Sequence, residues 1–253
     1  MRILVCLKQV PDTTEVKLSS DFTLQRDFIA QVMNPADESA LEKALALRDQ
    51  QGGEVTVLTM GPARTETMLR EALSRGADKA VLLTDPRFAG ADTLVTAQCL
   101  KAAVEKLGAF DLIFCGRRAV DGETGQVGPM LASLLNCACV ANATDVRLQE
   151  AGFAVDQLTE NGVIAWRAQA PALITFCEWS HRLRLPTISG LKKSRQAELT
   201  KWTPDDLSIT ACGLRASPTR VVKVSSRPVG VRPCQKLPLS DVLAALEEKG
   251  VLE

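Results

Sequence analysis

Alternation of short apolar runs with longer helical patterns limits the possible folds of the first half of the chain. Runs rich in β-branched and apolar residues occupy 2–8, 54–60, 79–84 and 110–116. Helical patterns lie near 37–51, 63–75, 91–107 and 125–136. Strands and helices that alternate in this way form a parallel sheet covered by helices on both faces. We therefore predict an α/β fold with a Rossmann-like, doubly wound sheet of the nucleotide-binding type over residues 1 to about 140.

The first predicted helix has a clear start signal. Asn34 is expected to cap it and Pro35 to occupy its first position. Asp37 and Glu38 fall in the first turn, where carboxylates interact favourably with the helix dipole. We expect the Asn34 cap alone to contribute about 1 kcal/mol to stability.

The pattern changes beyond residue 140. Short alternating segments separated by Gly-containing turns run to about residue 180, which predicts antiparallel strands or a hairpin added to the sheet. From Arg182 the chain is rich in Pro, Lys and Arg and ends in a short helical pattern, 239–250. We predict a nucleotide-binding α/β domain at 1–181, followed at 182–253 by a docking loop and a C-terminal arm that packs on another subunit.

Composition argues against several function classes. The 253 residues include 30 Lys+Arg and 30 Asp+Glu, so the chain has no net charge that would attract nucleic acid or an anionic membrane. No apolar run reaches the length of a membrane span and no signal-peptide pattern begins the chain, so we expect no membrane insertion and a cytoplasmic protein.

Cysteine and histidine usage predicts no metal site. The eight cysteines form no C-x-x-C pair, and His181 is the single histidine. Most of the cysteines lie in apolar runs and are expected to be buried and reduced. The one close pair, Cys137 and Cys139, is expected in a buried strand.

Four loops are predicted to meet at the carboxyl edge of the sheet, where ligands of such folds bind. They occupy 7–14, 33–38, 59–63 and 115–135. The last is glycine-rich and runs into a helix, whose free N–H groups and dipole suit a phosphate. There is no G-x-x-x-x-G-K-[ST] and no G-x-G-x-x-G after the first strand, so a P-loop or a standard NAD(P) site is not expected. Each loop taken singly is equally compatible with a structural turn or cap.

Seven ordered blocks of the sequence resemble one family. They are "ILVCLKQVPDTTEVK", "MNPADESALEKALALRD", "GGEVTVLTMGPA", "LREALSRGADKAVLL", "FDLIFCGRRAVDGETGQVGPMLA", "PALITF" and "ASPTRVVKV". Together they closely resemble the beta subunit of electron transfer flavoproteins. The resemblance implies an adenine-nucleotide-binding α/β domain and a C-terminal arm that embraces an alpha subunit. It also implies electron carriage by a cofactor, with no catalytic acid, base or nucleophile.

In this family the alpha subunit holds one FAD, and the beta subunit holds either AMP or a second FAD that accepts hydride from NADH. Residues 121–129 read DGETGQVGP and resemble the second-FAD type, DGDTAQVGP, with departures at Glu123 and Gly125. The resemblance therefore favours FAD, with AMP as the alternative. It implies electron bifurcation towards an acyl-CoA or other flavin dehydrogenase and towards ferredoxin or flavodoxin. An adenine-nucleotide-binding regulatory module without redox activity is the alternative of another class.

The resemblance also implies site residues. Nucleotide contacts are carried over to Cys6 (through its backbone), Asn34, Asp37, Met60, Asp121, Gly122, Glu123, Thr124, Gly125, Gln126, Val127 and Gly128. Cys6 is equally compatible with an ordinary strand residue and Asp37 with a helix cap. At Gly128 we expect close backbone approach or a positive φ, so that a bulky residue would expel the nucleotide and largely retain the fold.

Two further expectations concern charges and docking. Lys8 and Arg117 lie on the same loops as candidate charges near a flavin. In the family a loop after the last strand anchors the partner dehydrogenase, and Ile188 takes the anchor position here. The basic run Lys192, Lys193 and Arg195 follows it and would attract an acidic partner. Packing of Ile188 against its own domain is the competing interpretation.

Overall fold

The computed structural model describes residues 1–12, 30–222 and 236–251. The chain divides into two units, Met1–Arg220 and Val221–Glu253. Residues 182–220 thus pack with the first unit, although the sequence pattern places them with the arm. Part of the 7–14 loop, Cys234 and part of the arm lie outside the described residues.

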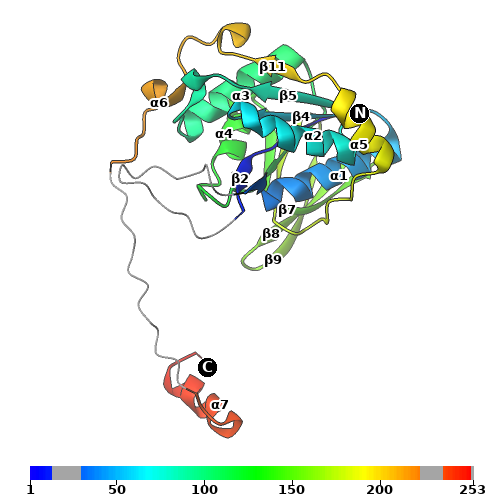
Figure 1. The fold of residues 1–253 in the computed structure, drawn as a ribbon. Coiled ribbons are helices and arrows are strands. Elements are labelled where there is room, and N and C mark those ends of the chain that lie inside the picture. Colours follow the sequence, from blue (N-terminus) through cyan, green and yellow to red (C-terminus); the bar gives the residue numbers. More distant parts are fainter. Residues whose placement is uncertain (13–29, 223–235, 252–253) are drawn as a thin grey trace. The chain divides into compact units, whose positions relative to one another are not determined.

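One nine-stranded sheet organises the first unit (Figure 1), in the order β11-β5-β4-β1-β6-β10-β7-β8-β9. Neighbouring strands run parallel from β11 to β7, and β8 and β9 are antiparallel additions. The strands are β1 (Arg2–Cys6), β4 (Glu54–Met60), β5 (Lys79–Leu83), β6 (Leu112–Gly116), β7 (Ala138–Gln149), β8 (Gly152–Thr159), β9 (Gly162–Ala168), β10 (Ala172–Phe176) and β11 (Thr200–Trp202). A separate antiparallel ribbon joins β2 (Gln9–Pro11) to β3 (Gln31–Met33).

Helices cover both faces of the sheet, because side chains along each strand alternate between two apolar clusters. In β1, Ile3 and Val5 face the cluster formed with α1 (Pro35–Gln51) and α2 (Glu66–Arg75). Leu4 and Cys6 face the cluster formed with α3 (Thr93–Leu107) and α4 (Val127–Leu134). Each side of the central strands is therefore an apolar interface with helices.

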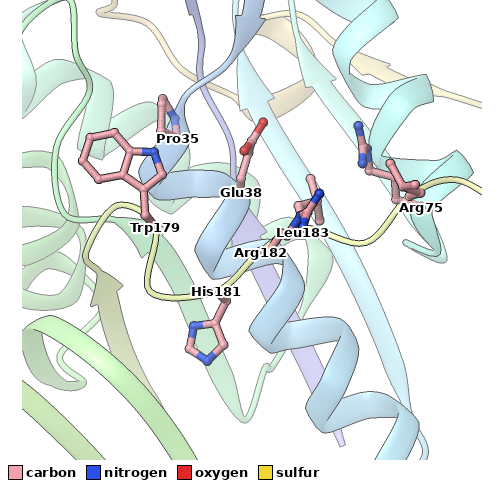
Figure 2. Close-up of a pocket in the computed structure, with 8 residues that line it drawn as sticks. Pro35, Glu38, Arg75, Trp179, His181, Arg182 and Leu183 are labelled. Carbon is pink, nitrogen blue, oxygen red and sulfur yellow. The ribbon is translucent and has the colours of Figure 1, made fainter.

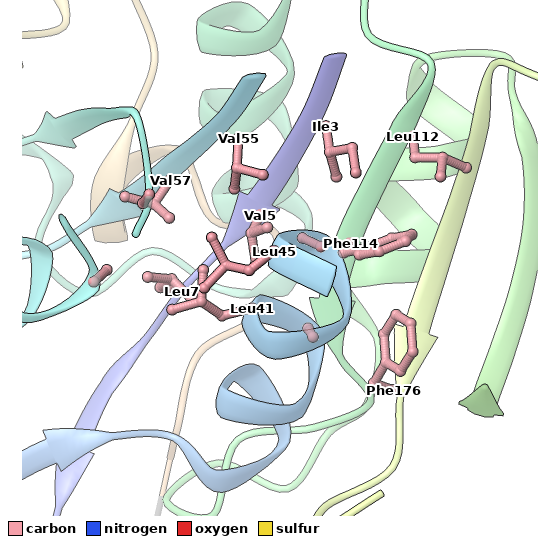
Figure 3. Close-up of a cluster of buried hydrophobic side chains, with 14 of the residues drawn as sticks. Ile3, Val5, Leu7, Leu41, Leu45, Val55, Val57, Leu112, Phe114 and Phe176 are labelled. Carbon is pink, nitrogen blue, oxygen red and sulfur yellow. The ribbon is translucent and has the colours of Figure 1, made fainter. Parts of the chain in front are cut away.

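Aromatic and branched side chains fill the core on the α1 side (Figure 3). Phe114 of β6 and Phe176 of β10 are fully buried and meet edge to face, with ring centroids 4.9 Å apart. Leu41 and Leu45 of α1 lie over Val5 at the centre of this cluster. The packing fixes α1 on the strands whose ends form the site described below.

The four predicted strands and four predicted helices of the first half are confirmed, and β4 has the predicted bounds. The segment 172–176 differs from expectation, because it forms a parallel strand between β6 and β7 instead of an antiparallel addition. All five of its residues are buried, which is typical of a strand covered on both faces. The predicted antiparallel hairpin is the β8–β9 pair that follows β7.

Residues 182–220 contain more structure than their composition suggests. Helix α5 (Ile188–Gln196) packs on α2 so closely that a Cβ on Gly190 would lie 2.2 Å from the carbonyl oxygen of Ser74. Strand β11 then extends the sheet beyond β5, and η1 (Ala63–Thr65), η2 (Pro86–Phe88), η3 (Asp205–Leu207) and α6 (Gly213–Ala216) are short helical turns. In the second unit, the predicted last helix is α7 (Leu239–Glu248).

The described cysteines carry free thiols, and Cys139 is exposed. The expectation that Cys137 and Cys139 lie in a buried strand is wrong. Cys137 precedes β7, and β8 pairs with β7 only from Ala143 onward, so the first residues of β7 have no β8 neighbour. Within the described ranges, three or more His, Cys, Asp or Glu side chains nowhere gather into a possible metal site. None of the helices there combines the length and apolarity needed to cross a bilayer.

Candidate functional site

β1 pairs with β4 on one side and with β6 on the other, and β6 pairs in turn with β10. The chain that follows β1 passes to the β4 side of the sheet, whereas the chain that follows β6 passes to the opposite side. The crevice outside the carboxyl ends of such neighbouring strands is where open α/β sheets bind ligands. Cys6, Met60 and Gly116 end their strands at this edge. The predicted loops therefore do converge on one place.

Asp37 joins three of these elements. It is only 5% exposed, and its Oδ2 accepts a hydrogen bond of 2.6 Å from the backbone N–H of Lys8, just after β1. Its Oδ1 accepts one of 2.9 Å from the backbone N–H of Gly116, the last residue of β6. A Cβ at Gly116 would lie 2.2 Å from that oxygen, so only glycine permits the contact. The first turn of α1 is thereby tied to the ends of both central strands.

Asn34 does not cap α1 with its side chain, contrary to expectation. Its Nδ2 donates to the backbone oxygen of Arg118 at 2.9 Å and to Asp37 Oδ1 at 3.0 Å. Its Oδ1 accepts from the backbone N–H of Val120 at 3.2 Å. The buried amide thus holds the loop after β6 in place, and its polar atoms are engaged with the protein itself.

Asp121 and Lys8 form an ion pair at the carboxyl edge of the sheet, with Oδ1 and Nζ 2.6 Å apart. The Asp121 side chain is 9% exposed and that of Lys8 is 49% exposed. Lys8 therefore lies at the edge of the site with its ammonium group paired to Asp121.

The loop 121–126 turns through two left-handed residues, Glu123 (φ 50°) and Gly125 (φ 63°). The N–H of Glu123 donates to the carbonyl of Ala119 at 2.8 Å, which closes the turn. Helix α4 begins at Val127, two residues later than expected, and its first N–H groups have no intrahelical partner. The Gln126 side chain accepts a 2.8 Å hydrogen bond from Thr93 at the start of α3. The result is a glycine-containing turn that leads into a helix N-terminus.

Gly128 has a packing role that the sequence did not predict. Its φ lies outside the left-handed region. It is buried in α4, and a Cβ there would lie 2.6 Å from Cγ2 of Thr175 on β10. The glycine at this position therefore permits close packing of α4 on the sheet.

Cys6 and Met60 lie at the α3–α4 side of the crevice. Cys6 is 9% exposed and packs in that cluster, with half-buried Met60 at its margin. A hydrogen bond with Cys6 and burial raise the pKa of the neighbouring Cys115 thiol, so this thiol remains neutral.

Glu178 is a site residue that the sequence interpretation missed. Its side chain, 7% exposed, pairs with Arg117 at 2.6 Å and with Arg118 at 3.0 Å. Burial opposes ionisation, but hydrogen bonds from its own backbone N–H, Arg118 and Arg117 hold the pKa of Glu178 below its usual value. The loop after β6 is thus held by Asn34 on one side and by Glu178 on the other. The only signal in the sequence was an acid two residues after a buried apolar run.

Ile188 is not part of the crevice. It is the first residue of α5, which packs on α2, and is 88% exposed. The exposed isoleucine that the docking hypothesis requires is therefore present, on a helix instead of a loop.

Comparison with known proteins decides the family. Residues 21–207 match the electron transfer flavoprotein domain. The chain belongs to the electron transfer flavoprotein family.

The relatives also place it among the beta subunits. Protein FixA of Azorhizobium caulinodans is 44% identical over 235 residues, covering 88% of this chain and 84% of the relative. Electron transfer flavoprotein subunit beta of Thermoanaerobacterium thermosaccharolyticum is 42% identical, covering 89% and 88%. Subunit CarD of the caffeyl-CoA reductase-Etf complex of Acetobacterium woodii is 40% identical, covering 90% and 88%.

This electron transfer flavoprotein subunit contains an unusual buried acid in Asp37. Burial raises its pKa from 3.8 to about 7, although hydrogen bonds from Asn34, Lys8 and Gly116 oppose the shift. The native state therefore binds this proton more tightly than the unfolded chain does. The resulting stabilisation is complete below pH about 4 and is lost as the pH rises through about 7.

We predict that the unfolding free energy of the nucleotide-free chain falls between these pH values relative to that of Asp37→Asn, by at most about 1.4 kcal/mol per pH unit. Urea unfolding of both proteins across this range measures the difference. Other titrating groups are common to both proteins and cancel. Parallel stability profiles would show that Asp37 is ionised throughout.

A second prediction separates packing from ligand binding at Gly128. We expect Gly128→Val to destabilise the fold by about 1–3 kcal/mol, because the new side chain enters the interface between α4 and β10. Gly122→Ala is the matched control, since nothing lies within 4 Å of its Cβ position. It should change stability by less than about 0.5 kcal/mol. Urea unfolding tests both, and unchanged stability with loss of nucleotide in Gly128→Val would restore the original assignment.

Proposed function

We propose that this beta subunit binds FAD in the crevice at the ends of β1, β4 and β6. With its alpha subunit it would accept electrons from NADH and pass them to the alpha-subunit FAD, a flavin dehydrogenase and ferredoxin or flavodoxin. The observation that carries this proposal is the turn at Glu123 and Gly125 leading into the N-terminus of α4 at the centre of the sheet. That geometry suits the diphosphate of a dinucleotide. The heterodimer would work in the cytoplasm.

The residues present fit such a cofactor. The first N–H groups of α4 would face the phosphates, and the Lys8 ammonium, which pairs with Asp121, would lie at the edge of the same site. Gly125, in the left-handed region, has only the Arg117 carbonyl within 4 Å of its Cβ position, at 3.4 Å, so the backbone is open to a ligand. When bound, a flavin supplies the redox chemistry, and the protein holds it and sets its surroundings.

Asn34, Asp37 and Glu178 would act as positioning residues. Their polar atoms bind backbone groups or arginines of the loop after β6. They would set the shape of the nucleotide loop before the ligand arrives, which lowers the cost of ordering it on binding. Direct contact with the nucleotide would then fall to the backbone of residues 122–128.

Two alternative functions would use the same site with a different ligand or a different partner. A structural AMP would use the same phosphate position without a redox partner, as in an ordinary electron carrier. A regulatory module would bind an adenine nucleotide and need no alpha subunit. The resemblance of DGETGQVGP to the second-FAD type supports FAD.

The number of nucleotides released per heterodimer tests this assignment. We expect two FAD from the complex with the alpha subunit, measured by chromatography after denaturation. One FAD with one AMP would identify an ordinary carrier. An isolated chain that binds an adenine nucleotide and forms no complex would identify the regulatory module.

The docking role of Ile188 rests on its 88% exposure at the start of α5. We predict that Ile188→Ala slows electron exchange with the partner dehydrogenase by about tenfold or more, the size expected for loss of an interface anchor. Reduction by NADH should be unchanged. Stopped-flow kinetics separates the two steps, and Val163→Ala, at a 60% exposed position on β9, is the control. Unchanged partner transfer, or a loss confined to the NADH step, would exclude the role.

Helix α7 has the exposed apolar face expected of an arm that contacts the alpha subunit. Leu239 and Leu243 lie four positions apart, hence on one face, and are 89% and 64% exposed. Such a stripe is typical of a helix that buries its apolar face on a partner.

A further inference from the structure

Two segments pack on the first unit after the chain has left the central strands. The segment after β10 lies against α1 and α2 and borders a cavity of about 330 Å³ there (Figure 2). The residues that line this cavity belong to α1, to α2 and to 179–185, so the cavity is separate from the turn at 121–126. The second segment, 212–219, lies on the loop that leads from β5 into α3. We call it the arm base, because the second unit begins at Val221.

The arm base lies so close to this loop that both backbones need glycine. A Cβ on Gly213, whose φ is 66°, would lie 2.1 Å from the carbonyl oxygen of Arg87. A Cβ on Gly90, whose φ is 72°, would lie 3.0 Å from Cβ of Leu214. The N–H of Leu214 also donates to the carbonyl of Ala89 at 3.0 Å. A shift of one backbone would therefore displace the other.

Asp92, the residue before α3, binds the end of the arm base. Its Oδ2 accepts hydrogen bonds from the Thr219 hydroxyl at 2.8 Å and from the Thr219 N–H at 3.1 Å. Its own N–H donates to Ser217 Oγ at 2.9 Å. Its Oδ1 caps α3 by accepting from the N–H of Val95 at 3.0 Å. Hydrogen bonds from Val95 and Thr219 hold the pKa of Asp92 below its usual value, which keeps the carboxylate ionised.

Thr93, the first residue of α3, makes a contact in the other direction. Its hydroxyl donates to Oε1 of Gln126 at 2.8 Å. Gln126 ends the turn at 121–126 and directly precedes α4. Its carbonyl accepts the N–H of Met130 at 3.0 Å, in the first turn of that helix. Two consecutive residues, Asp92 and Thr93, thus connect the arm base to the turn.

We propose that Asp92 and Thr93 are positioning residues that couple the arm base to the turn at 121–126. The proposal rests on the proposed function for the ligand of that turn and for the partner of the arm. An alpha subunit held by the second unit would restrain the arm base, and Asp92 and Thr93 would then restrain Gln126 before a nucleotide binds. Less order remains to be gained on binding, so the nucleotide binds more tightly. The effect is reciprocal, so a bound nucleotide strengthens association of the alpha subunit.

Hydrogen exchange of the nucleotide-free full chain tests the coupling without a ligand or a partner. Ser217→Ala combined with Thr219→Val removes two hydroxyls of the arm base and alters no residue of α3 or of the turn. We expect the exchange rates of the hydrogen-bonded Glu123 and Met130 amides, measured by NMR, to rise roughly threefold or more. The rates are taken relative to the Val5 amide of β1, so that a general loss of stability cancels.

Substitutions at Thr93 identify the route. Thr93→Val removes the hydroxyl at nearly constant shape and should raise the same two rates by a similar factor. In that background the arm-base substitutions should have no further effect, which is the non-additivity expected of a shared path. Thr93→Ser retains the hydroxyl that reaches Gln126 and should behave like the wild-type chain. Thr159→Val is the matched control, because its hydroxyl bonds the Gly162 carbonyl at 2.8 Å in the β8–β9 hairpin, and it should change neither rate.

Either of two exchange results would overturn the proposal. In one, the arm-base substitutions change exchange only within 212–219. In the other, their effect on the turn adds fully to that of Thr93→Val.

FAD affinity provides the functional readout. Calorimetry measures FAD binding to the full chain alone and to its complex with a flavin-loaded alpha subunit. We expect the alpha subunit to tighten binding about fivefold or more in the wild-type chain and not in Thr93→Val. Equal FAD affinities of the wild-type chain and its complex would also overturn the coupling. A wild-type chain that binds neither FAD nor AMP would remove the proposed cofactor, whereas the exchange rates would still decide whether the arm base and the turn are coupled.

Discussion

The carboxylate of Asp37 is the interaction on which the site depends. Two backbone N–H groups, one after β1 and one at the end of β6, donate to its two oxygens. One donor follows β1 and the other ends β6, so one side chain ties the first turn of α1 to the ends of two neighbouring strands. Gly116 is required for this contact, because a side chain at that position would collide with the Asp37 carboxylate. A buried acid is costly, and the chain retains it where the crevice opens.

Around Asp37, side chains hold the loop after β6 in place, whereas the backbone of the turn that follows is open to a ligand at Gly125. Asn34 and Glu178 hold the loop after β6 through its carbonyl, its amide and its two arginines. The turn at Glu123 and Gly125 then leads to the free N–H groups of α4. The polar side chains thus hold the loop in place, and under the proposed function the backbone would contact the nucleotide. An electron carrier benefits from such a division, because the cofactor performs the chemistry and the protein must keep it in one place.

Sequence reasoning predicted the α/β architecture and the convergence of the loops, since both follow from strand and helix periodicity. It could not predict that 172–176 enters the parallel sheet, because a short apolar run has no periodicity that gives its direction. The position of Asn34 just before a helix predicted a cap. Only the three-dimensional path of residues 118–120 shows that its side-chain amide binds the backbone of that loop instead. Gly128 fitted a phosphate loop, but its neighbour Thr175 is 47 positions away in the sequence. Glu178 was missed for the same reason. Side chains that act across long sequence separations leave no local pattern.

The outermost strand, β9, has a consequence for handling the subunit alone. Val163, Ile164 and Trp166 are 60%, 45% and 49% exposed on a strand whose single neighbour within the described part of the chain is β8. An uncovered apolar edge is a template on which further strands can pair, and it promotes self-association and aggregation. A purified sample of this chain alone should therefore self-associate more as its concentration rises, through the β9 edge.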